Sequence, residues 1–208
     1  MKKILTLLLT LITTGGIAQV EIRHGLLLGG GRGFVSGAAT NINPEFWDGM
    51  ATVSEIFTKY RYNALLGYRL RIIPPNGKAF YDIDASVSFK NIEYSIWPER
   101  IILPEEPSVL FFPMGGKRNF FMSLSLIYNR LIYKGLYVGA GIAPVYCDDR
   151  DPSVPNHFDV PLVVKAGYDL RFIDLSFSHG FGTVSLLKDR YLTSGRINDW
   201  QIQLFIPF

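Results

Sequence analysis

The chain has a single cysteine, few charged residues and no long hydrophobic run. With Cys147 alone no internal disulfide can form, and no Cys/His pair has the spacing of zinc ligands. Without Lys2 and Lys3 the formal net charge of +3 falls to about +1, a balance that offers no basic stripe for nucleic acid. Beyond the N-terminal segment no stretch reaches 18 consecutive apolar residues, which excludes helical membrane spans.

The N-terminal segment has the three parts of a secretory signal. Lys2 and Lys3 form a basic region, residues 4–12 are apolar, and small residues follow at 15–18. The apolar part is shorter than the roughly 20 residues of a spanning helix, so we expect cleavage near Ala18 rather than an uncleaved anchor. The sequence therefore predicts a signal peptide over 1–18 and one mature domain over 19–208.

Residues 59–72 alternate between apolar and polar side chains over about fourteen positions. Period-two alternation is typical of a strand, whose successive side chains point to opposite faces, and this run exceeds the usual five or six residues. A tight turn is predicted at 74–77, and a second alternating run follows at 81–90. If this hairpin closes about Asn76, Arg69 lies opposite Asp82 on the polar face.

The same alternation recurs to the end of the chain. Further strands are predicted at about 20–30, 120–129, 136–146, 159–172, 174–181 and 199–208, which gives eight in all. Gly139 and Gly141 share one face of the 136–146 strand, but the pattern does not decide which face points outward. The last strand carries an apolar row that ends at the last residue; the row is Trp200, Ile202, Leu204, Ile206 and Phe208.

The predicted connections alternate between short and long. Only a few residues join strands two to three, four to five and six to seven, whereas the other four connections span about 31–58, 91–118, 147–157 and 184–197. Short turns at one rim and long loops at the other are typical of transmembrane barrels. We therefore predict an all-β fold: an eight-stranded antiparallel transmembrane up-and-down β-barrel with short periplasmic turns and long external loops.

The polar rows of such a barrel must pair their charges, because a buried unpaired charge is costly. An eight-stranded barrel has an interior just filled by side chains, so a salt-bridged plug is expected rather than a wide pore. The expected interior charge network is Arg69, Arg71, Asp82, Asp84, Lys165, Asp169 and Arg171. Aromatic residues near strand ends, among them Tyr60, Tyr62 and Tyr128, are expected to face the membrane interfaces.

With its signal sequence, its eight alternating segments and the row from Trp200 to Phe208, the chain resembles the small outer-membrane β-barrel proteins of the OmpX and OmpA transmembrane-domain type. The resemblance covers the mature chain. It implies an outer-membrane location, contact with outer-membrane lipid and lipopolysaccharide, and recognition of the terminal row by the barrel-assembly machinery. We expect no peptidoglycan-binding domain of the OmpA kind.

Few residues suggest chemistry. Gly29–Gly33 and residues 115–118 lack the remaining positions of nucleotide-binding fingerprints and are interpreted as a strand end and a loop tip. Residues 148–151 miss the spacing of a calcium loop. Ser178 and His179 could act as nucleophile and base, but neighbours on a strand point to opposite faces. The lipid A deacylase family has a serine two residues after its histidine, where this chain has Phe181.

We therefore expect a non-enzymatic outer-membrane protein without cofactor or metal. It would act through its external loops, in contact with a surface or a protein partner or in envelope integrity. The loops 31–58 and 91–118 carry Trp47 and Trp97 among other apolar residues. Two alternatives remain open at this point, a lipid-modifying outer-membrane enzyme and a soluble exported carrier of the lipocalin kind.

Overall fold

The structure is a computed structural model that describes residues 20–40, 51–101, 114–148, 157–187 and 192–208. The expected signal peptide at 1–18 and Trp47 lie outside the described residues. Among the described residues, no helix has the length and apolar character needed to cross a membrane.

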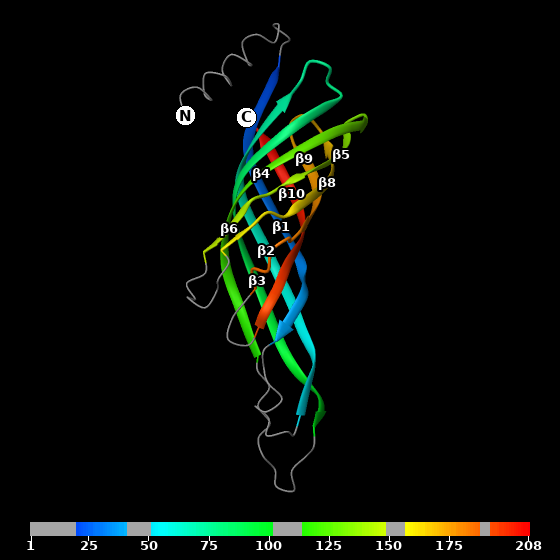
Figure 1. The fold of residues 1–208 in the computed structure, drawn as a ribbon. Helices are drawn as coiled ribbons and strands as arrows, with labels where there is room; N and C mark the ends of the chain where they lie inside the picture. Colours follow the sequence, from blue (N-terminus) through cyan, green and yellow to red (C-terminus); the bar gives the residue numbers. More distant parts are fainter. Residues whose placement is uncertain (1–19, 41–50, 102–113, 149–156, 188–191) are drawn as a thin grey trace, which may run out of the picture.

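The described residues form ten antiparallel strands (Figure 1). They are β1 (Glu21–Thr40), β2 (Ala51–Ile73), β3 (Ala79–Ile101), β4 (Met114–Tyr133), β5 (Leu136–Ile142), β6 (Val145–Asp148), β7 (Phe158–Asp159), β8 (Leu162–Asp169), β9 (Asp174–Phe181) and β10 (Leu192–Pro207). Most of these strands have the predicted alternation of apolar and polar residues, because every second side chain of a strand lies on the same face of the sheet.

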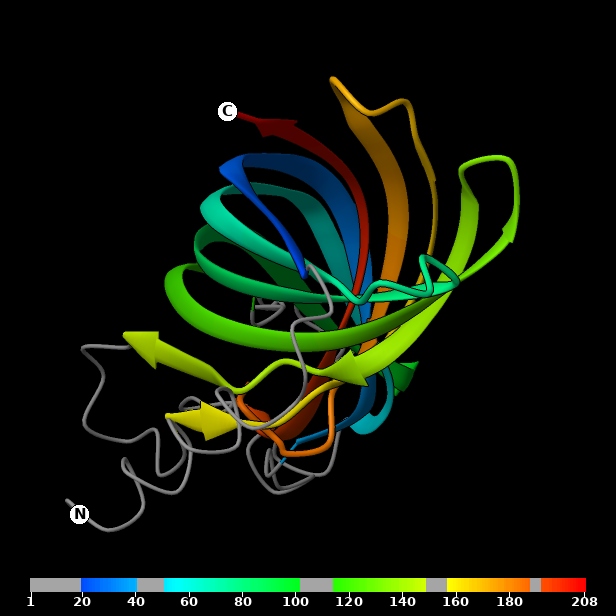
Figure 2. The same ribbon diagram turned by 90° about the horizontal axis from the view of Figure 1, so that it is seen from above.

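The strands pair in chain order and the last one returns to the first. β1 pairs with β2 and with β10, and β3 pairs with β4, so the sheet forms a ring without a free long edge between these strands (Figure 2). Both β5 and β6 pair with β4; Pro144 interrupts the ladder between them. Pro161 separates β7 from β8 in the same way, since proline has no N–H to donate.

Three short turns lie at one end of the ring. Residues 74–78 join β2 to β3, Lys134 and Gly135 join β4 to β5, and residues 170–173 join β8 to β9. In the first turn Gly77 donates its N–H to the carbonyl of Pro74 (2.9 Å) and adopts a φ of +59°, which favours glycine. Phe208 lies at this same end, where its N–H bonds the carbonyl of His24.

The predicted long loops 31–58 and 91–118 are wrong over much of their length. β1 runs to Thr40, β3 runs to Ile101, and residues 115–118 belong to β4 rather than to a loop tip. Gly29–Gly33 lies within β1. The ladder between β2 and β3 continues out to the pair Ala51 and Ile101, but it contains register shifts that break the period-two pattern. Alternation alone therefore predicts strand ends that lie too early in β1 and β3 and too late in β4.

Two further boundaries differ from the prediction. β8 ends at Asp169, and residues 170–173 turn the chain where the strand was expected to continue to 172. β10 begins at Leu192, inside the predicted loop 184–197, because it pairs with β1 out to Thr40.

The structure also decides which face of β5 points inward. Tyr137 is fully buried whereas Leu136 and Val138 are exposed, so Gly139 and Gly141 share the inner face with Tyr137.

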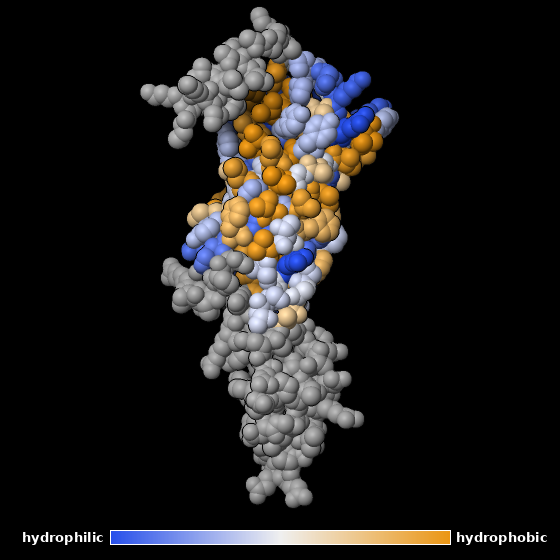
Figure 3. Space-filling view, in the orientation of Figure 1, coloured by the Kyte–Doolittle hydropathy of each residue, from blue (hydrophilic) through white to orange (hydrophobic). Residues whose placement is uncertain are grey.

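Near the short turns the inner face of the ring is ionic and polar, and the outer face is apolar. Arg69, Asp82 and Lys165 are at most 3% exposed, whereas Leu66, Leu124 and Ile202 are more than half exposed. On the face seen in Figure 3, a hydrophobic band separates two hydrophilic zones. This distribution is the reverse of a soluble globular protein, whose large apolar side chains are mostly inside.

Candidate functional site

The inner face near the short turns holds an ion-pair cluster, which starts at the β2–β3 hairpin. Arg69 and Asp84 are opposite each other in the ladder, as are Arg71 and Asp82. The guanidinium of Arg69 binds Asp84 through two bonds, Nε to Oδ1 at 2.7 Å and Nη2 to Oδ2 at 2.8 Å. Arg71 binds both carboxylate oxygens of Asp82 at 2.7 and 3.1 Å. Such paired bonds are the strongest geometry for arginine and carboxylate.

Strands across the ring complete the cluster. Lys165 of β8 lies 2.7 Å from Oδ2 of Asp82, and Asp174 of β9 lies 3.0 Å from Nη1 of Arg71. Arg23 of β1 binds Asp169 at 3.1 Å. Because the partners come from β1, β2, β3, β8 and β9, the ion pairs tie together strands on opposite sides of the ring.

The cluster is electrically balanced. Its four cations are Arg23, Arg69, Arg71 and Lys165, and its four inward carboxylates are Asp82, Asp84, Asp169 and Asp174; the exposed Glu21 also pairs with Arg23. Aromatic rings also contact the cations: the Arg71 guanidinium lies 4.1 Å from the ring centroid of Phe80. Removal of one partner from a buried pair costs about 3–5 kcal/mol, because the other charge stays buried. The arrangement stabilises the interior at this end of the ring, and each charge of the cluster has an opposite charge as its partner.

The structure brings six of the seven expected network residues together. Arg171 is the exception and its assignment to the interior is wrong: it is exposed on the β8–β9 turn with a φ of +72°, where its N–H bonds Asp169. The expected opposition of Arg69 and Asp82 is also wrong by two residues, because Gly77 lengthens the turn and moves its centre. The two side chains still approach to 3.8 Å.

Sequence reasoning missed several members of the cluster. Asp174 of β9 and Arg23 of β1 are not among the residues of the expected network. Tyr137 is fully buried and donates its hydroxyl to Asp174 at 2.8 Å. The short turn between Asp169 and Asp174 was the available signal, since it places both carboxylates at the same end of the ring.

An apolar cluster fills the opposite part of the interior. It consists of Tyr60, Ile92, Phe121, Val145, Cys147, Leu186, Leu187 and Ile197, with Val35 packed against it. The segment 182–187 follows β9 and contributes the two leucines, both at most 4% exposed. Asp159 holds this segment: its Oδ1 accepts bonds from the N–H of Thr183 and Val184 and from the Thr183 hydroxyl.

The expectation that Tyr60 faces a membrane interface is wrong, because its side chain is buried in the interior. The register shift between Tyr60 and Tyr62 turns the Tyr60 side chain inward, where its hydroxyl donates to Asp199 at 2.6 Å. Asp199 also pairs with Lys90, whose ammonium lies 4.5 Å from the ring centroid of Phe121. Gly33 makes room for the ring, because a Cβ there would lie 2.9 Å from it. Tyr62 itself is exposed, as expected.

Ser178 and His179 lie on opposite faces and do not form a nucleophile–base pair. Ser178 faces the interior, whereas the His179 ring packs on the outer side against Phe181 and Trp200, with centroids 4.1 Å away in each case. Within the described part of the chain, no three His, Cys, Asp or Glu side chains are placed to hold a metal ion.

Exposed aromatic residues form two belts on the outer face. On β3, β4 and β10 they lie eight residues apart: Tyr81 and Phe89, Phe120 and Tyr128, Trp200 and Phe208. Tyr81 lies opposite Tyr128 in the ladder, and Phe89 lies opposite Phe120. At about 3.3 Å per residue and a strand tilt of about 40°, eight residues span about 20 Å along the barrel axis. This is close to the about 25 Å apolar band of outer-membrane barrels.

The expected terminal row points outward. Trp200, Ile202, Ile206 and Phe208 are 36–75% exposed, and Leu204 lies between them on the same side of β10. The ring of Phe208 packs edge-on against His24, with 5.4 Å between centroids, and lies 6.4 Å from the ring of Tyr68. The last residue is thereby fixed to both β1 and β2.

Comparison with known proteins gives only a weak structural likeness. No protein-family model matches the chain, and no curated protein matches it. Among solved structures, the outer membrane protein OprG from Pseudomonas aeruginosa aligns over 91% of this chain and 93% of its own, with 12% identity and a TM-score of 0.43. The translocator domain of the autotransporter NalP from Neisseria meningitidis aligns over 100% and 94%, with 11% identity and a TM-score of 0.23. Because both TM-scores lie below 0.5, we draw nothing about function from them.

Proposed function

We propose that this protein is an integral outer-membrane β-barrel whose closed interior is structural and whose role lies at the end of the barrel away from the short turns. If β5 with β6 and β7 with β8 each count as one strand interrupted by proline, the ten segments make eight up-and-down strands. The single observation that carries the proposal is the outer face, where apolar side chains fill the space between two aromatic belts.

The outer face supports a lipid environment for a physical reason. A soluble protein rarely exposes an apolar patch larger than a few hundred Å², because water disfavours such a surface. Here exposed apolar residues follow one another along β4, where Met122, Leu124 and Leu126 are each more than half exposed. Arg130, also exposed, follows Tyr128 by two residues, as expected at the edge of a membrane.

The closed ring supports the same proposal. Backbone N–H and C=O groups in hydrocarbon must find partners within the protein, and a ring of paired strands satisfies them. The balanced ion cluster inside the ring removes the cost of unpaired charges and favours a scaffold over a wide pore. We infer that the protein acts without catalysis, through contacts of its outer end with lipopolysaccharide, a surface or a protein partner, or in envelope integrity.

Export and assembly belong to the same proposal. The leader over residues 1–18 would direct secretion, and the barrel-assembly machinery would recognise the row from Trp200 to Phe208. Sequencing of the mature N-terminus is expected to find Gln19 first.

Fractionation of cells that express the full chain tests the location. We expect the protein in the outer membrane, resistant to urea extraction, and faster in gel migration before boiling than after. Recovery from the soluble periplasm would contradict the proposal and favour the lipocalin-like carrier. Altered lipid A in an expressing strain, reversed by Ser178→Ala, would favour the enzyme instead.

A further inference from the structure

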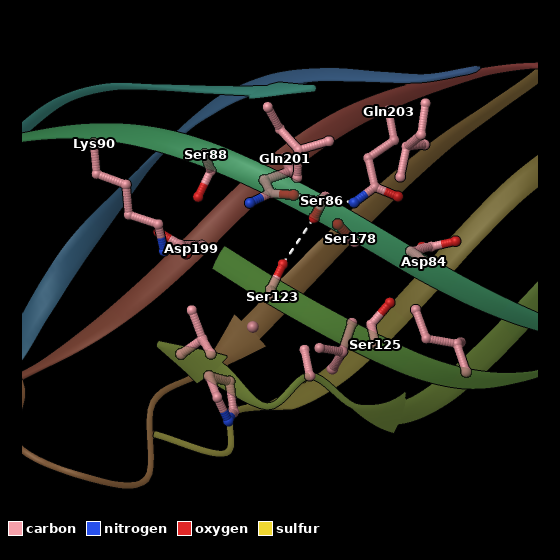
Figure 4. Close-up of a pocket in the computed structure, with 18 residues that line it drawn as sticks. Asp84, Ser86, Ser88, Lys90, Ser123, Ser125, Ser178, Asp199, Gln201 and Gln203 are labelled. Atoms are coloured by element: carbon pink, nitrogen blue, oxygen red, sulfur yellow. Dashed lines mark hydrogen bonds and ion pairs between the residues drawn. The ribbon is translucent and has the colours of Figure 1, made fainter. Parts of the chain in front are cut away.

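A polar chamber lies inside the ring between the ion cluster and the apolar cluster (Figure 4). Lys90 and Asp199 bound it at one end, and Asp84 and Gln203 bound it at the other. Its volume, including the part open to solvent, is about 650 Å³, and its free space has room for roughly six water molecules.

Hydroxyl groups line this chamber in unusual number. Ser86 and Ser123 bond each other at 2.7 Å. Ser88, Ser125 and Ser178 also line the chamber, and their hydroxyls have no hydrogen-bond partner among the described residues. Because these hydroxyls face the open space of the chamber, water or a small molecule inside it can supply the hydrogen-bond partners that the described side chains do not.

The charges at the ends of the chamber are already neutralised. Lys90 pairs with Asp199, and Asp84 accepts two bonds from Arg69. An ion in the chamber would therefore lose its hydration without gaining an opposite free charge. Apolar side chains, including Leu27, Leu65, Ile127 and Val163, form the remaining wall and suit C–H groups. The lining thus combines hydrogen-bonding groups with apolar contacts and carries no net attraction for ions.

We propose that this chamber is a binding site for a small uncharged polyol of about the size of glycerol. Each hydroxyl of such a molecule can both donate to and accept from a serine, and its carbon chain can contact the apolar wall. A polyol would replace several ordered waters while keeping their hydrogen bonds. The inference goes beyond the proposed function and does not depend on the location of the protein in a membrane.

The segment 182–187 provides the access route. Val145 both lines the chamber and belongs to the apolar cluster, so Leu186 and Leu187 lie next to the chamber on that side. At the other end of the chamber several ion pairs join the strands, so loss of one side chain would not open that end. Asp159 holds the segment through one carboxylate oxygen, so a change at this residue should loosen the segment without touching the chamber wall.

Saturation-transfer NMR with glycerol on the folded full chain in detergent micelles tests the site. We expect saturable transfer to glycerol at millimolar concentration and none to sucrose, which is too large, or to formate, which is charged. Ser125→Leu fills the chamber and should abolish the signal, while Ala166→Leu, on the outer face of β8, should leave it unchanged.

Gel migration before and after boiling checks that each variant is folded. If Ser125→Leu does not fold, Ser178→Ala removes one hydroxyl without adding volume and should weaken the signal. Absence of transfer to glycerol in the unaltered protein would mean that the chamber holds water only and would overturn the proposal. Equal transfer to sucrose, or a signal that survives in folded chamber variants, would overturn it as well.

Asp159→Asn tests the access route. The glycerol exchange rate should rise on the order of tenfold, the factor that corresponds to one charge-assisted hydrogen bond. An unchanged rate in this variant would overturn the assignment of segment 182–187 as the way in.

Discussion

Two arginine substitutions on β4 test whether the outer face of the ring contacts lipid or water. Leu124 and Ile132 are both 58% exposed on the outer side of the same strand. Leu124 lies midway between Phe120 and Tyr128, about 10 Å from each belt along the barrel axis, whereas Ile132 lies four residues beyond Tyr128. In a membrane, Leu124→Arg places a charge near the middle of the hydrocarbon, and Ile132→Arg places it outside.

The expected costs therefore differ. Leu124→Arg should lower the free energy of unfolding by about 2–4 kcal/mol, and Ile132→Arg by about 0–1 kcal/mol. In water the two positions would respond alike, because equally exposed surface substitutions usually change stability by less than about 0.5 kcal/mol. Urea unfolding in lipid vesicles, followed by tryptophan fluorescence, measures both values. Equal costs at the two positions would refute the membrane band between the aromatic belts.

Three further predictions concern the turn, the ion cluster and the last residue. Gly77→Ala should destabilise the fold by about 1–2 kcal/mol in the same unfolding assay, because its φ is positive, whereas Gly180→Ala, with an ordinary φ and open space at its Cβ, should cost less than about 0.5 kcal/mol. A double-mutant cycle with Arg69→Met and Asp84→Leu should give a coupling of about 2 kcal/mol, and additive effects would contradict the paired geometry. Deletion of Phe208 should reduce the fraction assembled in the outer membrane, measured by gel migration before boiling; unchanged assembly would speak against its role as a signal.

The ring of antiparallel strands follows closely from the sequence because alternation is a local property. The runs 59–72 and 81–90 contain few irregularities, so each side chain could be given a face from its position alone. Prediction failed where the ladder has bulges, as at Tyr60, because one extra residue reverses every face beyond it. The loops at 31–58 and 91–118 were overestimated for the same reason.

The sequence predicts that the interior holds an ion cluster, but it does not predict which charges pair with each other. A balanced set of arginines and aspartates on inner rows indicated an ion cluster, yet the partners depend on turn geometry and on strands far apart in the sequence. Gly77 moves the hairpin by one pair, which joins Arg69 to Asp84. Nothing in the local pattern indicated that Leu186 and Leu187 would fold into the interior.

The sequence by itself determined which face of most strands is apolar and which is ionic, because a period of two needs no knowledge of neighbours. Only the tertiary structure decided which charges meet, how the interior divides into an ion cluster, a hydroxyl-lined chamber and an apolar cluster, and that Asp159 holds the segment beside them. The contacts of the ion cluster join residues that lie between 11 and 146 positions apart, and their geometry depends on the register and closure of the whole ring.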